Sequence, residues 1–239
     1  MYMVHLTQHE FNRQIDNGCS TVLLPIGMLE GHGDHIALGT DILIPREFVR
    51  RLEAEVGEKI MMAPEIVYGH SFALAPFRVT IDVPQNVFTE YVVNIGVQFL
   101  QQGFRHVILF NGHGGNIPSL AEVAERLAAL GAYILMLNWW LDYRTTITQF
   151  APSTDHGGEN ETSCVLAIDE SLVEMEYAHN HKNTLSSKIK CKDIGLKIFP
   201  NAISRDTLQA TATKGEQIYA ALLPKIRKAI EELWTFSSN

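Results

Sequence analysis

Residues 106–138 read HVILFNGHGGNIPSLAEVAERLAALGAYILMLN, and this stretch decides the fold class. Its start, residues 106–110, is a short apolar run typical of a buried strand. Residues 118–130 have the spacing of an amphipathic helix that Gly131 ends, and residues 133–138 are apolar again. A strand, a helix and a second strand in this order predict two parallel strands joined by a right-handed crossover.

The rest of the chain repeats this alternation of apolar runs and amphipathic segments. Further strands are expected at residues 21–26 (TVLLPI), 60–63 (IMMA) and 66–68. Further helices are expected at 45–56, with Pro45 in the first turn, and at 90–102, 161–169 and 214–233. The pattern predicts one α/β domain over residues 1–239, with helices on both faces of a central, mostly parallel sheet (α/β/α).

Composition and charge exclude several classes of protein. The chain has 239 residues, of which 46% are hydrophobic and 19% charged, so a disordered chain, a collagen and a coiled coil are excluded. Nineteen Lys and Arg against 27 Asp and Glu give a net charge of −8, which argues against a nucleic-acid partner. One basic stretch is expected to be a solvated loop face; it contains Lys182, Lys188, Lys190, Lys192 and Lys197.

Cysteine usage and the apolar runs bear on the compartment. Cys19, Cys164 and Cys191 are scattered and lack CxxC spacing, which fits a reducing compartment rather than a disulfide framework. The N-terminus has no leader pattern, and no apolar run approaches the ~20 residues of a membrane helix. We expect a cytoplasmic protein without a membrane partner.

Three loops that follow predicted strands carry metal-binding side chains. Ligands gather beyond the carboxyl ends of the strands in open parallel sheets. Carboxylate oxygens and imidazole nitrogens without thiolates suit Zn²⁺, Mn²⁺, Fe²⁺ or Co²⁺. If there are two metal sites, a carboxylate such as Asp41 could bridge ions ~3.5–4 Å apart and hold a nucleophilic hydroxide between them. The candidates are Glu30, His32, Asp41, His113, His156, Glu159 and Glu161.

Each of these residues also has a simpler interpretation. The loop at 112–116 could bind phosphate at a helix N-terminus, although it matches neither GxGxxG nor GxxxxGK[ST]. Glu159 and Glu161 could merely complement a helix dipole. His35 is either a buried hydrogen-bonding residue or a ligand, and His70 belongs either to a pocket or to the framework. The occurrence of ligand-type residues in three loops at matching sheet ends favours a metal site.

At these loops the sequence resembles the creatininase (creatinine amidohydrolase) family. The matching segments lie in residues 20–170 and are 24–35 (LPIGMLEGHGDH), 38–41 (LGTD), 111–116 (NGHGGN) and 156–163 (HGGENETS). Three positions depart from the family: Asp34 replaces the proline of HGPH, Gly115 replaces a glutamate of creatininases proper, and FRVT at 77–80 replaces a phenylalanine-proline-glycine-threonine run. The last departure points away from creatinine itself as substrate.

The resemblance implies a Rossmann-like layered fold, a homo-oligomer (a hexamer or another multiple of dimers or trimers) and two divalent metal ions per chain, Zn²⁺, Mn²⁺ or Fe²⁺. It implies that Glu30 and His113 hold one ion, that His32 and Glu161 hold the other, and that Asp41 bridges them. His156 would then act as the general acid–base. Glu159 is expected to belong to the catalytic site with His156, where it would support these ligands or replace one of them.

A substrate pocket is expected beside the ligands. Arg78 could recognise a carboxylate or phosphate of the substrate, or form a structural ion pair, and Trp140 could wall the pocket or belong to the core. The residues expected to bind substrate are Tyr68, His70, Ser71, Arg78, Gly114 and Trp140.

The leading hypothesis is a metal-dependent hydrolase that cleaves a C–N bond of an amide, cyclic amide or formamide in a small molecule through metal-activated water. The family's range of substrates implies a second hypothesis, a ring-opening hydrolase or isomerase of a keto-sugar or keto-inositol. Two hypotheses of other classes are a metal-binding protein without catalysis and a phosphate-binding α/β protein that uses the 111–116 loop.

Overall fold

The computed structural model describes residues 1–181 and 189–237 and is built around one parallel sheet. Its strands are β1 (Thr21–Ile26), β2 (Met61–Met62), β3 (His106–Asn111) and β4 (Tyr133–Asn138), in the order β2-β1-β3-β4. Ile26 pairs with Asn111, and Asn111 pairs with Asn138. The carboxyl ends of the three longer strands are therefore level, and the predicted α/β class with a parallel central sheet is confirmed.

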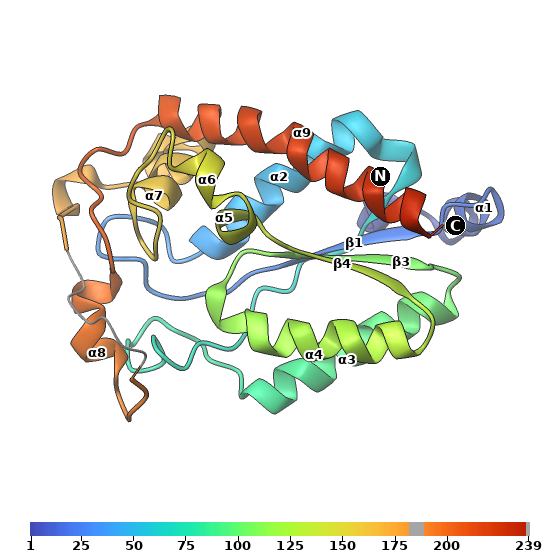
Figure 1. Ribbon diagram of the computed structural model, residues 1–239, viewed down its shortest axis with the longest axis horizontal. Helices are drawn as coiled ribbons and strands as arrows, with labels where there is room; N and C mark the ends of the chain where they lie inside the picture. Colours follow the sequence, from blue (N-terminus) through green and yellow to red (C-terminus); the bar gives the residue numbers. More distant parts are fainter. Residues whose placement is uncertain (182–188, 238–239) are drawn as a thin grey trace.

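Helices cover both faces of this sheet. Figure 1 shows α2 and α9 on one side and α3 and α4 on the other. The helices are α1 (Gln8–Asp16), α2 (Thr40–Val56), α3 (Gln85–Gln101), α4 (Ile117–Ala129), α5 (Trp139–Asp142), α6 (Arg144–Ile147), α7 (Glu159–Ile168), α8 (Gly195–Ile198) and α9 (Ala212–Phe236). Short 3₁₀ turns occur at Met3–His5, Gly57–Lys59, Gly114–Asn116, Glu170–Leu172, Met175–Tyr177 and Pro200–Ala202.

Side chains of each strand alternate between two apolar clusters, one on each face of the sheet. On β3, Ile108 and Phe110 pack in the cluster of α2 and α9, whereas Val107 and Leu109 pack in the cluster of α3 and α4. A strand with both faces covered is apolar at nearly every interior position, which is why these strands appear in the sequence as apolar runs with polar residues at their ends.

Helix α2 starts earlier than the sequence predicted, and the extra residues place Asp41 in its first turn. The helix begins at Thr40 and contains Pro45, which was expected in the first turn. Pro45 has no N–H to donate to the carbonyl of Asp41. A Cβ at Gly27 would lie 2.6 Å from this carbonyl oxygen, and one at Gly112 would lie 2.1 Å from it. Only glycine therefore lets the ends of β1 and β3 approach the turn that carries Asp41.

Other expectations need smaller corrections. Residues 66–68 form no strand, only an isolated bridge between Ile26 and Ile66. Helix α3 begins at Gln85 rather than at residue 90, and α1 and α8 had no counterpart in the sequence analysis. Within residues 1–181 and 189–237, no helix is long and apolar enough to cross a membrane. Lys182 and Lys188 of the basic stretch lie outside the described residues.

Candidate metal centre

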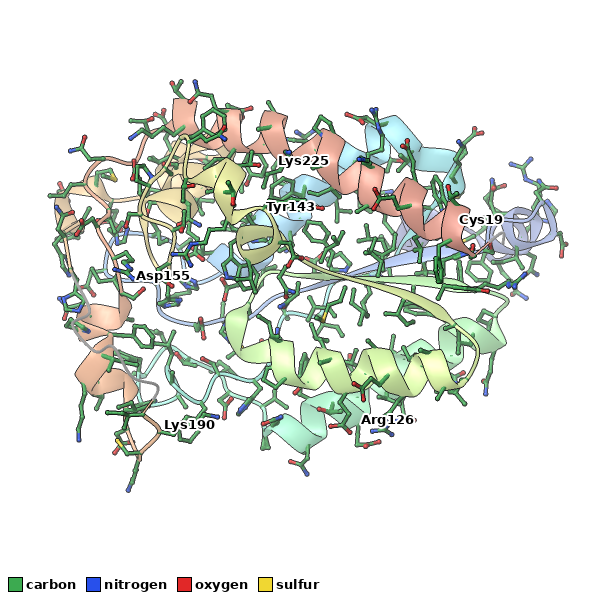
Figure 2. All side chains as sticks on the ribbon, in the orientation of Figure 1. Cys19, Arg126, Tyr143, Asp155, Lys190 and Lys225 are labelled. Carbon is green, nitrogen blue, oxygen red and sulfur yellow. The ribbon has the colours of Figure 1, made fainter. Side chains whose placement is uncertain are left out.

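Five buried side chains meet beyond the carboxyl end of the sheet. The loop after β1 carries Glu30 and His32, and the first turn of α2 carries Asp41. His113 follows β3, and Glu161 lies in the first turn of α7. None of the five is more than 6% exposed. They lie at the end of the molecule where Figure 2 labels Asp155, which lines the same cavity as four of them.

Asp41 stands between two histidines. Its Oδ2 lies 2.9 Å from Nδ1 of His113, and its Oδ1 lies 3.0 Å from Nε2 of His32. Oε1 of Glu30 is 3.1 Å from Nδ1 of His113, and Oε2 of Glu161 is 3.8 Å from Nε2 of His32. Two groups of ligand atoms share Asp41, Glu30–Asp41–His113 and His32–Asp41–Glu161, and a third group consists of Glu30, His32 and His156; within each group all the atoms lie within 4.8 Å of one another.

Backbone carbonyls orient both imidazole rings. Nε2 of His113 donates a hydrogen bond to the carbonyl of His70 at 3.1 Å, and Nδ1 of His32 lies 3.3 Å from the carbonyl of Glu30. In the neutral rings this leaves the nitrogen that faces Asp41 with its lone pair, as a metal ligand requires. Asn111 also fixes the main chain of His113, because its amide accepts from the His113 N–H and donates to the His113 carbonyl.

The surroundings of the Glu30 carboxylate indicate whether these residues fit a metal ion. The carboxylate is fully buried, and neither oxygen accepts a hydrogen bond from any residue in the described part of the chain. Nδ1 of His113 lies 3.1 Å from Oε1 of Glu30, but in the neutral ring that donates to the His70 carbonyl this nitrogen has no hydrogen to donate. A buried carboxylate without a donor is costly, and a cation satisfies it directly. Carboxylate oxygens with imidazole nitrogens form the donor set of divalent first-row ions. The residues present therefore fit a bound metal.

Proton affinities in the centre reflect this crowding of acids. Burial lowers the pKa of His32, but the negative charges of Asp41, Glu161 and Glu30 outweigh it and raise this pKa to about 9. Burial raises the pKa of Glu161 to about 8, against the opposing effect of His32. A divalent cation would favour the deprotonated forms of both groups, because it replaces these protons.

His156 lies at the edge of the two groups. Its Nε2 donates to the carbonyl of Gly31 at 2.8 Å, and its Nδ1 lies 3.6 Å from Oε1 of Glu30. Its ring contacts the rings of His32, at 4.2 Å between centroids, and Phe199, at 5.6 Å. Burial and the positive charge of His32 lower the pKa of His156 to about 4. The ring is therefore neutral at pH 7, with an unprotonated nitrogen toward the centre.

Glu159 faces away from the centre, contrary to its prediction as a catalytic residue or alternative ligand. Its Oε1 pairs with Nζ of Lys214 on α9 at 2.5 Å, and its Oε2 accepts from the N–H of Ser153 at 3.4 Å. It belongs to none of the ligand groups found among the described residues. Of the two glutamates, it is Glu161 that converges with His32 and Asp41.

A cavity of about 410 Å³ opens beside the ligands. His70, Ser71, Gly114 and Trp140 line it as predicted. Tyr68 and Arg78 do not, and both are exposed. Sequence patterns did not indicate that Asp155, Gln85 and a further, largely apolar wall also line the cavity. That wall consists of Phe72, Ala73, Leu74, Ile189, Lys190, Ile194, Ile198 and Phe199.

The segment 189–199 has no regular spacing, so nothing in the sequence marked it as part of a site. Lys190, Lys192 and Lys197 of the basic stretch are all exposed, as expected for a solvated face, and Lys190 also lines the cavity. Figure 2 labels Lys190 below α8, at the same end of the molecule as Asp155.

His35 is a hydrogen-bonding residue outside the ligand groups. Its Nε2 lies 2.9 Å from the hydroxyl of Thr162, and its Nδ1 is buried without a partner in the described residues. Burial lowers its pKa to about 4, and the positive charges of His179 and His32 act in the same direction. Asp34, considered as a partner for His32, is exposed instead.

The pKa of His35 predicts a loss of stability in mild acid. Between pH 6.5 and 4 the unfolded chain binds a proton at this residue that the folded chain does not, so stability is complete above pH 6.5 and falls below it. His35→Gln keeps a group that can bond Thr162 and should remove about 1 kcal/mol of the loss between pH 7 and pH 5. Urea unfolding of both proteins at the two pH values measures this; equal losses would contradict it.

The parallel sheet, the ligand groups at its carboxyl end and the adjoining cavity define a metal-binding α/β enzyme. Comparison with known sequences identifies the family within this class. The profile of the creatininase family, described as creatinine amidohydrolase, matches residues 4–230. The chain therefore belongs to the creatininase family and is an enzyme of the amidohydrolase type, with residues that fit a bound metal.

Similar proteins carry several different activities. A creatinine amidohydrolase of Pseudomonas putida is 26% identical over 201 residues, 76% of each chain. A mycofactocin precursor peptide peptidase of Mycobacterium tuberculosis is 28% identical and covers 88% of this chain and 84% of its own. A 3-dehydro-scyllo-inosose hydrolase of Thermotoga maritima is 27% identical and covers 74% of this chain and 59% of its own.

Solved structures agree with the fold. A manganese creatininase superposes with a TM-score of 0.85 at 24% identity, and a mutant creatininase of Zn-Zn type superposes with a TM-score of 0.83 at 24% identity. Each match covers 97% of both chains.

Proposed function

We propose that the protein holds two divalent ions, Zn²⁺, Mn²⁺ or Fe²⁺, and hydrolyses a C–N bond of an amide, cyclic amide or formamide in a small molecule. The observation that carries this proposal is the sharing of Asp41 by two ligand groups. Glu30 and His113 would hold one ion, and His32 and Glu161 the other. The two oxygens of Asp41 face different histidines, which is the arrangement a bridging carboxylate needs.

Each protein group has a role that follows from its position. Bound divalent ions supply an activated water and polarise a carbonyl group. Glu30, Asp41 and Glu161 balance the charge of the ions, and the backbone carbonyls behind His32 and His113 keep these rings aimed.

His156 is the proposed general acid–base. Nδ1 of His156 can accept a proton during attack and deliver it to the departing nitrogen, because the Gly31 carbonyl holds the opposite edge of its ring. Burial favours the neutral ring, so Nδ1 begins unprotonated and able to accept a proton. This free base beside an open cavity also supports catalysis over a purely structural or storage role for the metals.

The cavity supports a small substrate. Its volume of about 410 Å³ lies in the lower part of the usual range for small-molecule sites. Ser71, Gly114 and Trp140 are proposed to contact the substrate, since they line the cavity. A ring-opening hydrolase or isomerase of a keto-sugar is the second candidate, supported by the similarity to the 3-dehydro-scyllo-inosose hydrolase.

Domain organisation and assembly are also part of the proposal. Residues 1–239 are proposed to form one domain, since α1 from the start of the chain and α9 from its end both pack against the same sheet. A homo-oligomer in the cytoplasm is proposed from the family resemblance and from the unpaired cysteines. Exposed apolar residues between 72 and 91, Phe72, Val79, Ile81, Val87 and Tyr91, support a contact between subunits.

Metal content tests the centre, and the two glutamates of α7 provide a matched pair. Two first-row metal ions per chain are expected in protein purified without chelator and measured by elemental mass spectrometry. Glu161→Gln should lose one of them, because its Oε2 belongs to a ligand group. Glu159→Gln should keep both and lose stability by about 1–3 kcal/mol, because it removes the negative charge that pairs with Nζ of Lys214. The reverse pattern would contradict the ligand assignment.

A further inference from the structure

The backbone of His70 is held against a metal-ligand residue. Its carbonyl accepts the hydrogen bond from Nε2 of His113, and its N–H donates to Oδ1 of Asn116 at 3.0 Å. The amide of Asn116 donates in turn to the carbonyl of Gly27 at 3.1 Å. A Cβ at Gly69 would lie 2.2 Å from Oδ1 of Asn116, so this close packing requires glycine. The main chain at residue 70 therefore has little freedom to move.

The ring of His70 is oriented by the carboxylate of Asp82, which has no role in the proposed function. Nδ1 lies 3.1 Å from Oδ1 of Asp82 and 3.1 Å from the carbonyl of Val83. The same Asp82 oxygen accepts the N–H of Ser71 at 2.7 Å. Both neighbours of Nδ1 are acceptors, so Nδ1 carries the hydrogen, and Nε2 of the neutral ring is an acceptor.

Nε2 of His70 has no hydrogen-bond partner among residues 1–181 and 189–237, and His70 lines the cavity. The side chain is 17% exposed, so this edge of the ring is reached from the cavity rather than sealed in the core. His70 thus orients the His113 ring through its backbone carbonyl, and its own ring offers a hydrogen-bond acceptor to the cavity.

We propose that Nε2 of His70 accepts a hydrogen bond from an N–H or O–H group of the substrate beside the bond that is cleaved, and that Asp82 is the residue that positions the ring. The inference rests on the proposed function and names its substrate class. Secondary amides, formamides and other compounds with a donor at this point bind, whereas N-substituted tertiary amides bind weakly. A substrate without the donor leaves a desolvated acceptor unpaired, which sites of this kind reject strongly.

Two hydroxamates test this preference without knowledge of the natural substrate. Acetohydroxamate carries an N–H, and N-methylacetohydroxamate lacks it; calorimetry measures their binding to the zinc-loaded protein. Wild type should bind acetohydroxamate about tenfold more tightly. His70→Asn keeps a donor toward Asp82 but has no Nε2, so the ratio should fall to about 1. His70→Gln places an acceptor near Nε2 and should restore part of the preference, and Asp82→Asn should reduce it.

Metal content separates this inference from the proposed function. Every variant should keep the metal content of wild type, because the backbone carbonyl that holds His113 is retained. An unchanged ratio in His70→Asn, with metal intact, overturns the inference and leaves the proposed function standing. Failure of both hydroxamates to bind metal-loaded wild type counts against the proposed open metal centre.

Whether or not the hydroxamates bind, chemical modification with diethyl pyrocarbonate measures the accessibility of Nε2 of His70. Diethyl pyrocarbonate should modify His70 of wild type, and acetohydroxamate should slow this reaction, as read by peptide mass spectrometry. The exposed His5 and His9 are internal controls that acetohydroxamate should not protect. An unmodified His70 beside modified His5 and His9 would overturn the inference, because Nε2 would then not face the cavity.

Discussion

Replacement of Asp41 by Asn is expected to remove both metal ions and to lower kcat/KM by at least about 10³-fold. Each oxygen of the Asp41 carboxylate faces a different histidine, His113 at 2.9 Å and His32 at 3.0 Å. An amide offers one oxygen, and its NH₂ group would point at a nitrogen that must act as a ligand. The change also removes one negative charge from the centre, so both ligand groups are weakened at once.

Elemental mass spectrometry and turnover of a panel of amides, formamides and keto-sugars measure this effect. Asp34→Asn is the matched control, because it removes the same charge seven residues away at an exposed position and should change neither quantity. Circular dichroism should show that both variants fold, since Asp41 lies at the start of α2 rather than in its apolar face. Full activity in a metal-free Asp41→Asn protein would contradict the proposed mechanism.

His156→Gln is expected to lower kcat by about 10²–10⁴-fold while both metal ions stay bound. A glutamine can keep the hydrogen bond that Nε2 of His156 donates to the Gly31 carbonyl, but it has no basic nitrogen at the position of Nδ1. The bound metals depend on other side chains, so the chemical step should suffer and not the assembly of the centre. Steady-state kinetics with elemental analysis of the same sample measures both.

The contrary outcome for His156 is well defined. Glu30, His32 and His156 also form a group that could hold an ion. If His156→Gln loses a metal ion together with its activity, His156 is a ligand and not the acid–base. His9→Gln, at an exposed site, controls for the loss of a histidine and should behave as wild type.

Local pattern was enough to predict the sheet and the edge of it at which the candidate ligands gather. The strands at 21–26, 106–111 and 133–138 are apolar on both faces, so each is visible as an unbroken run. The metal-ligand candidates lie in the connecting segments that come after those runs, and parallel strands bring their carboxyl ends to one edge. The start of α2 was less visible, because Pro45 is typical of a first turn and here lies deeper in the helix.

The different contacts of Glu159 and Glu161 depend on the tertiary structure: Glu161 belongs to a ligand group, and Glu159 pairs with Lys214. Two residues apart on a helix, they point about 200° away from each other, so one must face the sheet end when the other does not. Nothing local distinguishes them. Packing of α9 brings Lys214 to Glu159, while the loop after β1 brings His32 to Glu161.

The cavity wall and the hydrogen bond that His70 donates to Asp82 depend in the same way on segments that meet only after folding. The sequence by itself determined the fold class and which residue types could bind metal, because strand runs and the residues at their ends are local features. Which carboxylates converge, which histidine lies at their edge and which residues line the cavity depend on contacts between distant segments, and these exist only in the folded chain.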